Sequence, residues 1–121
     1  VDIILRAYER RAAAEQAGSV TVTTDHDDAV AGADVIATDT WVSMGDEAQY
    51  EARADVFSRY QVNARTLELA NDGAQVLHCL PAYRGKEITA AVIDGPQSLV
   101  WLEAEYRLHA QKALLAWLAS R

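Results

Sequence analysis

The sequence predicts an α/β domain with a parallel sheet of about four strands, covered by helices on both faces. Two observations indicate this class. Candidate strands alternate with candidate helices along the chain, and each strand is a nearly continuous apolar run, as in strands buried on both faces. The 121 residues have the length of one domain, so we expect a single domain over 1–121.

The first third of the chain predicts one helix and two strands. Residues 1–17 are rich in Ala, Arg, Glu and Gln and end at a glycine, which is typical of a helix with its stop signal. The β-branched stretch "SVTVTT" (19–24) predicts a short strand, followed by the polar turn "DHDD". Residues 27–33 form at most a short helix or turn, and 34–41 predict a second strand that is apolar until Asp39.

The middle of the chain predicts two helices and a third strand. Residues 42–60 combine a loop around Gly45 with a helix of undefined length. In the stretch 63–73, Asn63 is a candidate N-cap and "NDG" is a stop signal, so a short helix is expected between them. The apolar run "QVLHCL" (75–80) then predicts a strand that ends at a proline.

The last third predicts a short helical stretch at 87–93, a turn at 94–98 and a fourth strand, "LVWL", at 99–102. Residues 103–119 predict a closing helix. Its apolar positions are Tyr106, Ala110, Ala113, Leu114 and Trp117.

Charge and composition exclude several classes of partner. The formal charge of −7 repels phosphate backbones and anionic lipid, so neither nucleic acid nor a membrane is an expected partner. The single cysteine cannot form an internal disulfide, which fits a cytoplasmic location. Three widely spaced histidines and the lack of a glycine-rich phosphate loop give no sign of a metal or cofactor, and we expect none.

Two polar clusters follow the ends of predicted strands. Asp39 ends one strand, and His78 and Cys79 end another just before Leu80. In a parallel sheet, the carboxyl ends of the strands share one edge, where ligands bind in α/β proteins. These residues are therefore expected to face one crevice.

Each candidate also has a purely structural interpretation. Cys79 can be a small core residue, because cysteines are often buried without a chemical role. Asp39 can cap or turn the following loop, and Ser43 can cap the next helix. His26 among aspartates is expected to be a solvated loop residue, and His109 on the closing helix a packing or surface residue. Composition and spacing alone leave both interpretations open.

Four motifs carry a family resemblance. From about residue 19 onward, "DTWVSMGDE", "HCLPAYRGKEIT", "VIDGPQS" and "EAEYRLHAQKALLAWL" occur in order. Together they resemble the carboxy-terminal, ornithine-binding domain of ornithine carbamoyltransferases, which has a Rossmann-like fold. Aspartate carbamoyltransferases share the fold, but the "SMG" and "HCLP" pair favours ornithine.

The resemblance implies the transfer of a carbamoyl group from carbamoyl phosphate to L-ornithine, which yields citrulline and phosphate, a step of arginine biosynthesis. It implies that Asp39 binds the amino groups of ornithine, and that Ser43 and Met44 hold its amino-acid end. Cys79 would lie beside the attacking amine and help to accept its proton. The carbonyls near Cys79 and Leu80, together with Arg107, would contact carbamoyl phosphate.

The sequence also departs from the family. The amino-terminal phosphate-binding motif (Ser-Thr-Arg-Thr-Arg) and the first half of the ornithine domain are absent, so we expect no turnover by this chain alone. The family has His at Tyr83, Asp at Leu102 and Asn at Tyr106. An aspartate at 102 would be a natural N-cap. Large apolar residues at such positions indicate a new interface, or a repaired core where a domain was cut away.

Two function classes follow. The first is the ornithine-binding part of a carbamoyltransferase. The second is an engineered or excised α/β fragment without catalysis, which associates with itself as a homo-oligomer. Natural variation in a truncated enzyme is the alternative explanation of the substitutions.

Overall fold

The computed structural model describes residues 19–42 and 50–121. The expected helix at 1–17 and the residues Ser43, Met44 and Gly45 lie outside this part. In chain order, the elements are α2 (His26–Val30), β1 (Val35–Thr38), α3 (Tyr50–Phe57), the 3₁₀ turn η2 (Ser58–Tyr60), α4 (Ala64–Leu69), β2 (Gln75–His78), α5 (Ala90–Ile93) and α6 (Val100–Ala119).

The sheet is parallel, as the sequence predicts. Strands β1 and β2 pair in a register that sets Val35 beside Gln75 and Thr38 beside His78. A short third segment, residues 97–99, pairs beside β2. The Val76 N–H donates to the Gln97 carbonyl, and the Val76 carbonyl accepts from the Leu99 N–H, both at 2.8 Å. The α/β class is thus confirmed, with two full strands among the described residues.

Two expected strands are not formed. Residues 19–24 join no ladder, and Val20 and Val22 are 49% and 64% exposed. β-Branched composition favours a strand only where a neighbouring strand and a packed face are present, and among residues 19–42 and 50–121 this segment finds neither. Of the expected strand at 99–102, only the Leu99 N–H bonds to Val76, whose bridge partner is Ser98, and α6 begins at Val100, three residues earlier than predicted.

The start of α6 also corrects the expected cap. The N-cap position is Leu99, whose side chain makes no capping hydrogen bond. Leu102 therefore lies inside the first turn, and position 102 is not the N-cap expected from the sequence.

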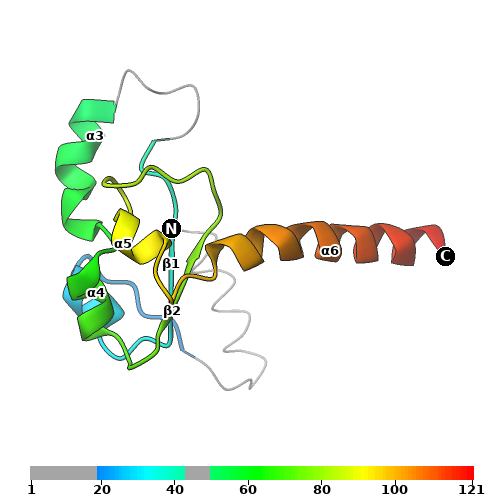
Figure 1. The fold of residues 1–121 in the computed structure, drawn as a ribbon, viewed down its shortest axis with the longest axis horizontal. Coiled ribbons are helices and arrows are strands. Elements are labelled where there is room, and N and C mark those ends of the chain that lie inside the picture. Colours follow the sequence, from blue (N-terminus) through cyan, green and yellow to red (C-terminus); the bar gives the residue numbers. More distant parts are fainter. Residues whose placement is uncertain (1–18, 43–49) are drawn as a thin grey trace.

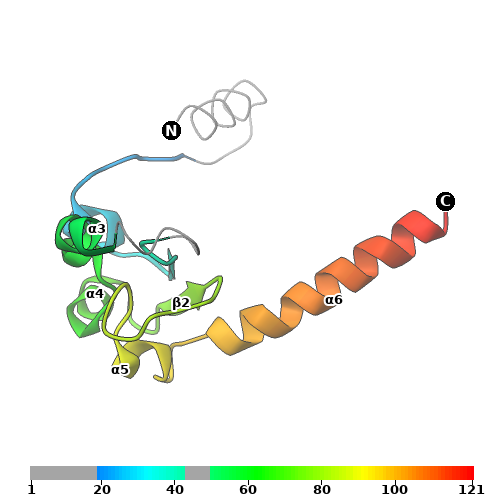
Figure 2. The same ribbon diagram turned by 90° about the horizontal axis from the view of Figure 1, so that it is seen from above.

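The core lies between the sheet and the short helices. Its buried members are Ile36, Val62, Val76, Ile88, Val92, Ile93 and Val100. On β1, Ile36 enters this core while Val35 and Ala37 on the opposite face are exposed. Helices α2 to α5 gather on one side of the two strands, and α6 extends away on the other (Figures 1 and 2).

The local start and stop signals of α4 were predicted correctly. The Asn63 side chain accepts from the Thr66 N–H, and the Thr66 hydroxyl accepts from the Asn63 N–H, which is a complete capping box. Gly73 has a φ of +77°, a conformation that glycine adopts without strain. These signals fix the length of α4 and the point at which β2 begins.

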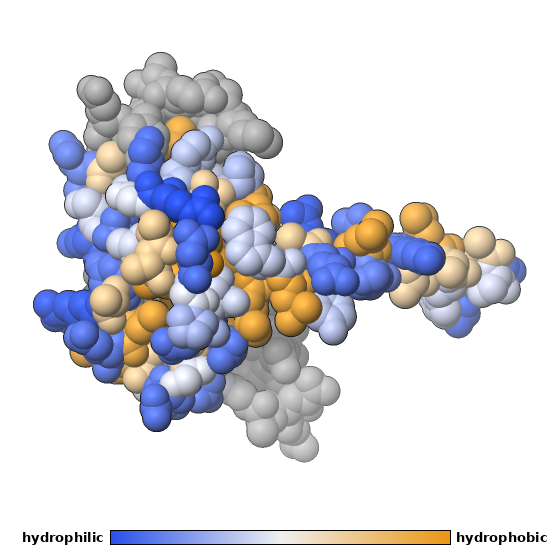
Figure 3. Space-filling view, viewed as in Figure 1, coloured by the Kyte–Doolittle hydropathy of each residue, from blue (hydrophilic) through white to orange (hydrophobic). Residues whose placement is uncertain are grey.

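Helix α6 carries a long exposed apolar surface. Large apolar side chains along it are exposed by half or more, among them Trp101, Tyr106, Leu108, Leu114, Leu115, Trp117 and Leu118. Figure 3 shows hydrophobic and polar side chains interleaved along this arm. Within the described ranges, α6 included, no helix is long and apolar enough to cross a membrane.

Candidate functional site

The carboxyl ends of β1 and β2 bring Asp39 and Cys79 together. Thr38 and His78 are register partners, so the next residue of each strand leaves the sheet at the same edge. There the Cys79 thiol donates a hydrogen bond to Asp39 Oδ1 at 3.0 Å, and both residues are exposed to solvent. The expected meeting of Asp39 and Cys79 at one edge is confirmed. The expectation that His78 faces the same crevice was wrong, because its ring is buried against Glu87.

The Asp39–Cys79 contact sets the charge of both groups. The hydrogen bond from Cys79 lowers the pKa of Asp39, helped by the Thr40 N–H, which donates to Oδ1 at 2.6 Å. The same hydrogen bond, followed by burial and the carboxylate charge, raises the pKa of the Cys79 thiol. At neutral pH the site therefore pairs an ionised carboxylate with a protonated thiol.

Helix α6 contributes two side chains to the end of β2. The Arg107 guanidinium donates from Nη1 to the Cys79 carbonyl at 3.1 Å. One turn earlier, Glu103 Oε2 accepts from the His78 N–H at 2.9 Å. The structure thus brings Arg107 to the residues with which the sequence grouped it, and it adds Glu103.

The loop after Cys79 has an unusual backbone. Leu80 is half-buried and has a φ of +55°, a left-handed conformation that a leucine rarely adopts. Such a conformation persists only where surrounding contacts hold it. The loop is therefore shaped by its neighbours rather than by its own preferences.

Those neighbours are His78 and Glu87, a pair that sequence reasoning did not identify. Both residues are 1% exposed, and His78 Nε2 lies 3.2 Å from Glu87 Oε1. His78 Nδ1 accepts from the Leu80 N–H at 2.9 Å, and Glu87 Oε1 accepts from the Tyr83 N–H. In the sequence, Glu87 looks like an ordinary surface glutamate at the start of a helical stretch. The only hint of its burial is that the apolar Ile88 follows it directly.

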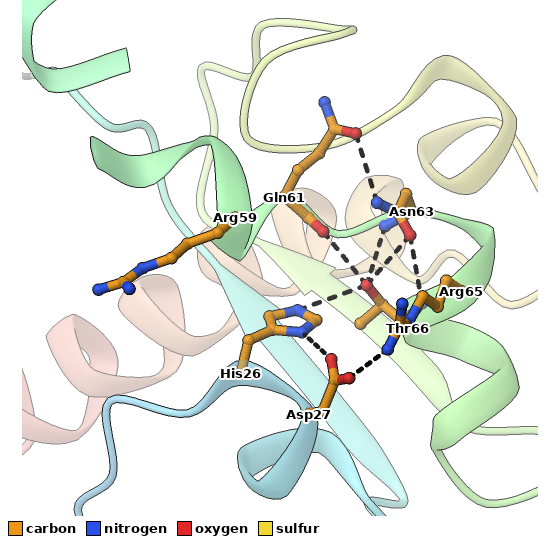
Figure 4. A pocket seen from close by; sticks show the side chains of 7 residues that line it. All are labelled: His26, Asp27, Arg59, Gln61, Asn63, Arg65 and Thr66. Carbon is orange, nitrogen blue, oxygen red and sulfur yellow. Dashed lines mark hydrogen bonds and ion pairs between the residues drawn. The ribbon is translucent and has the colours of Figure 1, made fainter. Parts of the chain in front are cut away.

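A second polar cluster lies between α2 and α4, around a pocket of about 220 Å³ (Figure 4). His26 contacts Asp27 through Nδ1 and Thr66 through Nε2, and Asp27 also pairs with Arg65. These groups satisfy one another and hold α2 on α4. The expectation that His26 is a solvated loop residue was wrong, because the ring is half-buried in this cluster.

His109 follows its predicted surface role. The ring is exposed on α6 and lies 3.4 Å from Glu105, one turn earlier in the helix. It lies on the exposed arm and takes no part in the Asp39–Cys79 contact.

Comparison with known proteins gives consistent matches. Residues 3–118 match the family described as "Aspartate/ornithine carbamoyltransferase, Asp/Orn binding domain". The ornithine carbamoyltransferase of Bifidobacterium longum subsp. infantis is 60% identical over 120 residues, which are 99% of this chain and 37% of that protein. The enzyme of Renibacterium salmoninarum is 64% identical over 107 residues, 88% of this chain and 34% of that protein.

The fold matches as well. The solved ornithine carbamoyltransferase of Pyrococcus furiosus aligns with a TM-score of 0.85 and 47% identity, over 95% of this chain and 36% of that one. That of Giardia lamblia aligns with a TM-score of 0.83 and 35% identity, over 94% of this chain and 35% of that one. The chain thus spans little more than a third of the length of these proteins.

Proposed function

The chain belongs to the aspartate/ornithine carbamoyltransferase family, and on this premise we propose that it forms the ornithine-binding part of an ornithine carbamoyltransferase site. The observation that carries the proposal is the Asp39–Cys79 hydrogen bond at the carboxyl edge of the sheet. It pairs the two residues to which the resemblance assigns the amino groups of the substrate. The substrates are L-ornithine and carbamoyl phosphate.

Asp39 is suited to hold an ammonium group. Its pKa is lowered, so it is an ionised acceptor at neutral pH, and it lies at the exposed edge where a ligand can reach it. Ser43 and Met44 would hold the amino-acid end of ornithine, as the resemblance implies. No geometry is assigned to them, because they lie outside the described residues.

Cys79 can accept a proton from the attacking amine only after its thiol has ionised. The resting thiol is protonated because Asp39 raises its pKa. An ammonium group bound to Asp39 would take over this hydrogen bond and offset the carboxylate charge, which lowers the thiol pKa. The exposed thiol releases its proton to solvent, and the thiolate so formed can then accept the proton that the amine must lose.

Arg107 is suited to the phosphate side of the reaction. In the transfer, the amine nitrogen forms a bond to the carbamoyl carbon, and the bond from that carbon to the phosphate oxygen breaks. Phosphate leaves with the electron pair, and a guanidinium stabilises the charge that develops on it. The Cys79 and Leu80 carbonyls would contact the carbamoyl group, and the Cys79 carbonyl already accepts from Arg107.

We expect this chain to be inactive by itself and to lie in the cytoplasm, where a lone thiol stays reduced. The phosphate would need more cationic donors than Arg107, and the family's Ser-Thr-Arg-Thr-Arg motif is absent from the sequence. The site would thus be one half of a complete site.

A chimera tests this function. This chain replaces the matching 120-residue segment of the Bifidobacterium longum subsp. infantis enzyme, and citrulline formation is measured. We expect activity in the chimera, little in its Asp39→Asn variant, and none in the isolated chain. An assembled chimera that forms no citrulline would contradict the proposal.

The exposed surface of α6 favours a second candidate, a self-associating fragment without catalysis. Tyr83, Leu102 and Tyr106, which replace polar family residues, are 42%, 44% and 60% exposed in the single chain. They are therefore available to an interface rather than part of a repaired core. Sedimentation equilibrium with and without ornithine distinguishes the two candidate functions. Only a self-associating fragment without catalysis predicts an oligomer whose mass does not change when ornithine is added.

A further inference from the structure

We propose that the buried His78–Glu87 pair is a positioning device, which holds the Cys79–Leu80 loop so that the Cys79 thiol meets Asp39. The proposal deepens the function above and rests on it for its catalytic meaning. Neither side chain would touch a substrate, because both are 1% exposed. They would act on the site through the backbone of the loop.

The pair joins the two ends of the loop. His78 Nδ1 accepts from the Leu80 N–H at 2.9 Å, at the loop's start, and Glu87 Oε1 accepts from the Tyr83 N–H, at its end. The contact of 3.2 Å between His78 Nε2 and Glu87 Oε1 closes this chain of hydrogen bonds. Loop residues 79–83 are therefore attached to the core at both ends.

The hydrogen bonds also define the form of the imidazole. Nδ1 faces the Leu80 N–H, a donor, so it must be the unprotonated nitrogen. Nε2 faces a carboxylate oxygen, an acceptor, so it carries the proton. Glu87 thus selects the one tautomer that leaves Nδ1 free to hold Leu80.

Glu87 is itself fixed in place. Its backbone carbonyl accepts from the Val62 N–H at 2.8 Å, and the next residue, Ile88, is a fully buried core member. His78 is the last residue of β2, and its N–H is bound by Glu103. Both residues of the pair are therefore anchored in the core, and the loop lies between them.

The consequence for the site lies in the Leu80 backbone. A leucine at a φ of +55° needs a partner that favours this conformation, and the His78 Nδ1 contact supplies it. The same contact holds the N–H of the peptide unit that joins Cys79 to Leu80, so it fixes the backbone of Cys79 and with it the direction of the thiol. Loss of the contact should release Leu80 and separate Cys79 from Asp39.

The rate of alkylation of Cys79 by iodoacetamide, followed against pH, tests the proposal on the full chain. Cys79 is the only cysteine, so the signal belongs to it alone. The charged groups near it are Asp39 after β1 and Glu103 and Arg107 on α6. Separation from Asp39 should move the midpoint of the pH profile downward and speed the reaction at pH 8 by about threefold or more.

Two substitutions of His78 separate its contact with the Leu80 N–H from its contact with Glu87. The amide oxygen of His78→Asn can occupy the place of Nδ1 and keep the Leu80 contact, whereas the longer His78→Gln reaches toward Glu87 and loses it. We expect His78→Asn to retain the wild-type profile and His78→Gln to shift it. The matched control is His109→Gln, an exposed histidine beside Glu105, which should change nothing.

A folded His78→Gln variant with the wild-type midpoint would overturn the proposal and leave the pair as core packing. If both variants unfold, ¹⁵N NMR of the His78 imidazole in the wild-type chain tests the proposal. A ring protonated on Nε2 alone supports it, and a ring protonated on Nδ1 or on both nitrogens overturns it. Neither readout involves ornithine. A chain that fails to bind ornithine but shows these responses would therefore refute the proposed function and leave the positioning role intact.

Discussion

The Cys79 thiol and the Asp39 carboxylate share a hydrogen bond of 3.0 Å, although the two residues lie 40 positions apart in the sequence. The contact joins the ends of two paired strands and raises the pKa of one partner while it lowers that of the other. The protonation states of Asp39 and Cys79 therefore determine which ligand charges and proton transfers this edge of the sheet can support.

Replacement of Asp39 should activate the thiol. Asp39→Asn removes the carboxylate charge that raises the pKa of Cys79, so iodoacetamide should react faster at pH 8, by about threefold or more. The control Asp94→Asn removes an exposed carboxylate that pairs with Arg84, and it should leave the rate unchanged. Equal rates in wild type and Asp39→Asn would show that the hydrogen bond does not form in solution.

The same pair should make stability depend on pH at both ends of the range. The pKa of Asp39 is lowered in the fold, so its contribution is present above its ordinary value of 3.8 and is lost as pH falls through the folded pKa. The pKa of Cys79 is raised, so its contribution is present below its ordinary value of 9.0 and is lost as pH rises through the folded pKa.

Cys79→Ala removes the titrating thiol and the largest cause of the lowered pKa of Asp39, and only the smaller effect of the Thr40 N–H and His78 remains. The free energy of unfolding, measured by urea titration at pH 3, 7 and 10, should therefore vary less with pH in Cys79→Ala than in wild type. Parallel pH curves for the two proteins would contradict the assignment.

The capping box of α4 should contribute more to the free energy of unfolding than a nearby exposed side-chain hydrogen bond does. Asn63→Ala leaves the Thr66 N–H without its side-chain acceptor and should lower the free energy of unfolding by about 1 kcal/mol. Asn71→Ala removes only an exposed hydrogen bond to Asp34, and it should cost less in the same urea titration. A larger loss from Asn71→Ala would mean that the end of α4, not its start, controls this region.

If α6 mediates self-association, charges on its apolar surface should weaken it. Leu114 and Trp117 are 55% and 51% exposed, so Leu114→Glu and Trp117→Glu should raise the dissociation constant without unfolding the chain. Gln111→Glu adds the same charge on the same helix in place of a polar residue and serves as the control. Sedimentation equilibrium that finds one association state for all three variants and wild type would assign the interface elsewhere.

The sequence predicted the parts of the site that depend on local signals and strand direction. Asp39 and Cys79 could be placed together because each follows an apolar strand, and parallel strands end at one edge. Asn63 could be recognised as a cap because its role depends on residues within one helical turn.

Other features depend on tertiary contacts that no local pattern records. The His78–Glu87 pair spans nine positions and is buried only because the loop folds back on the core. The β-branched stretch 19–24 has the composition of a strand, but it pairs with no strand in the part of the chain that the structure describes. The first turn of α6 resembled a strand because residues 99–102 form a short apolar run, which does not distinguish a strand from the start of a helix.

Titration of the isotope-labelled chain with L-ornithine tests the central claim most directly. At constant pH and ionic strength, we expect saturable NMR shifts at Asp39 and Cys79, and their loss in Asp39→Asn with the fold intact. Shifts that persist in Asp39→Asn, or a wild-type chain that shows none at these residues, would contradict an ornithine site at this edge of the sheet.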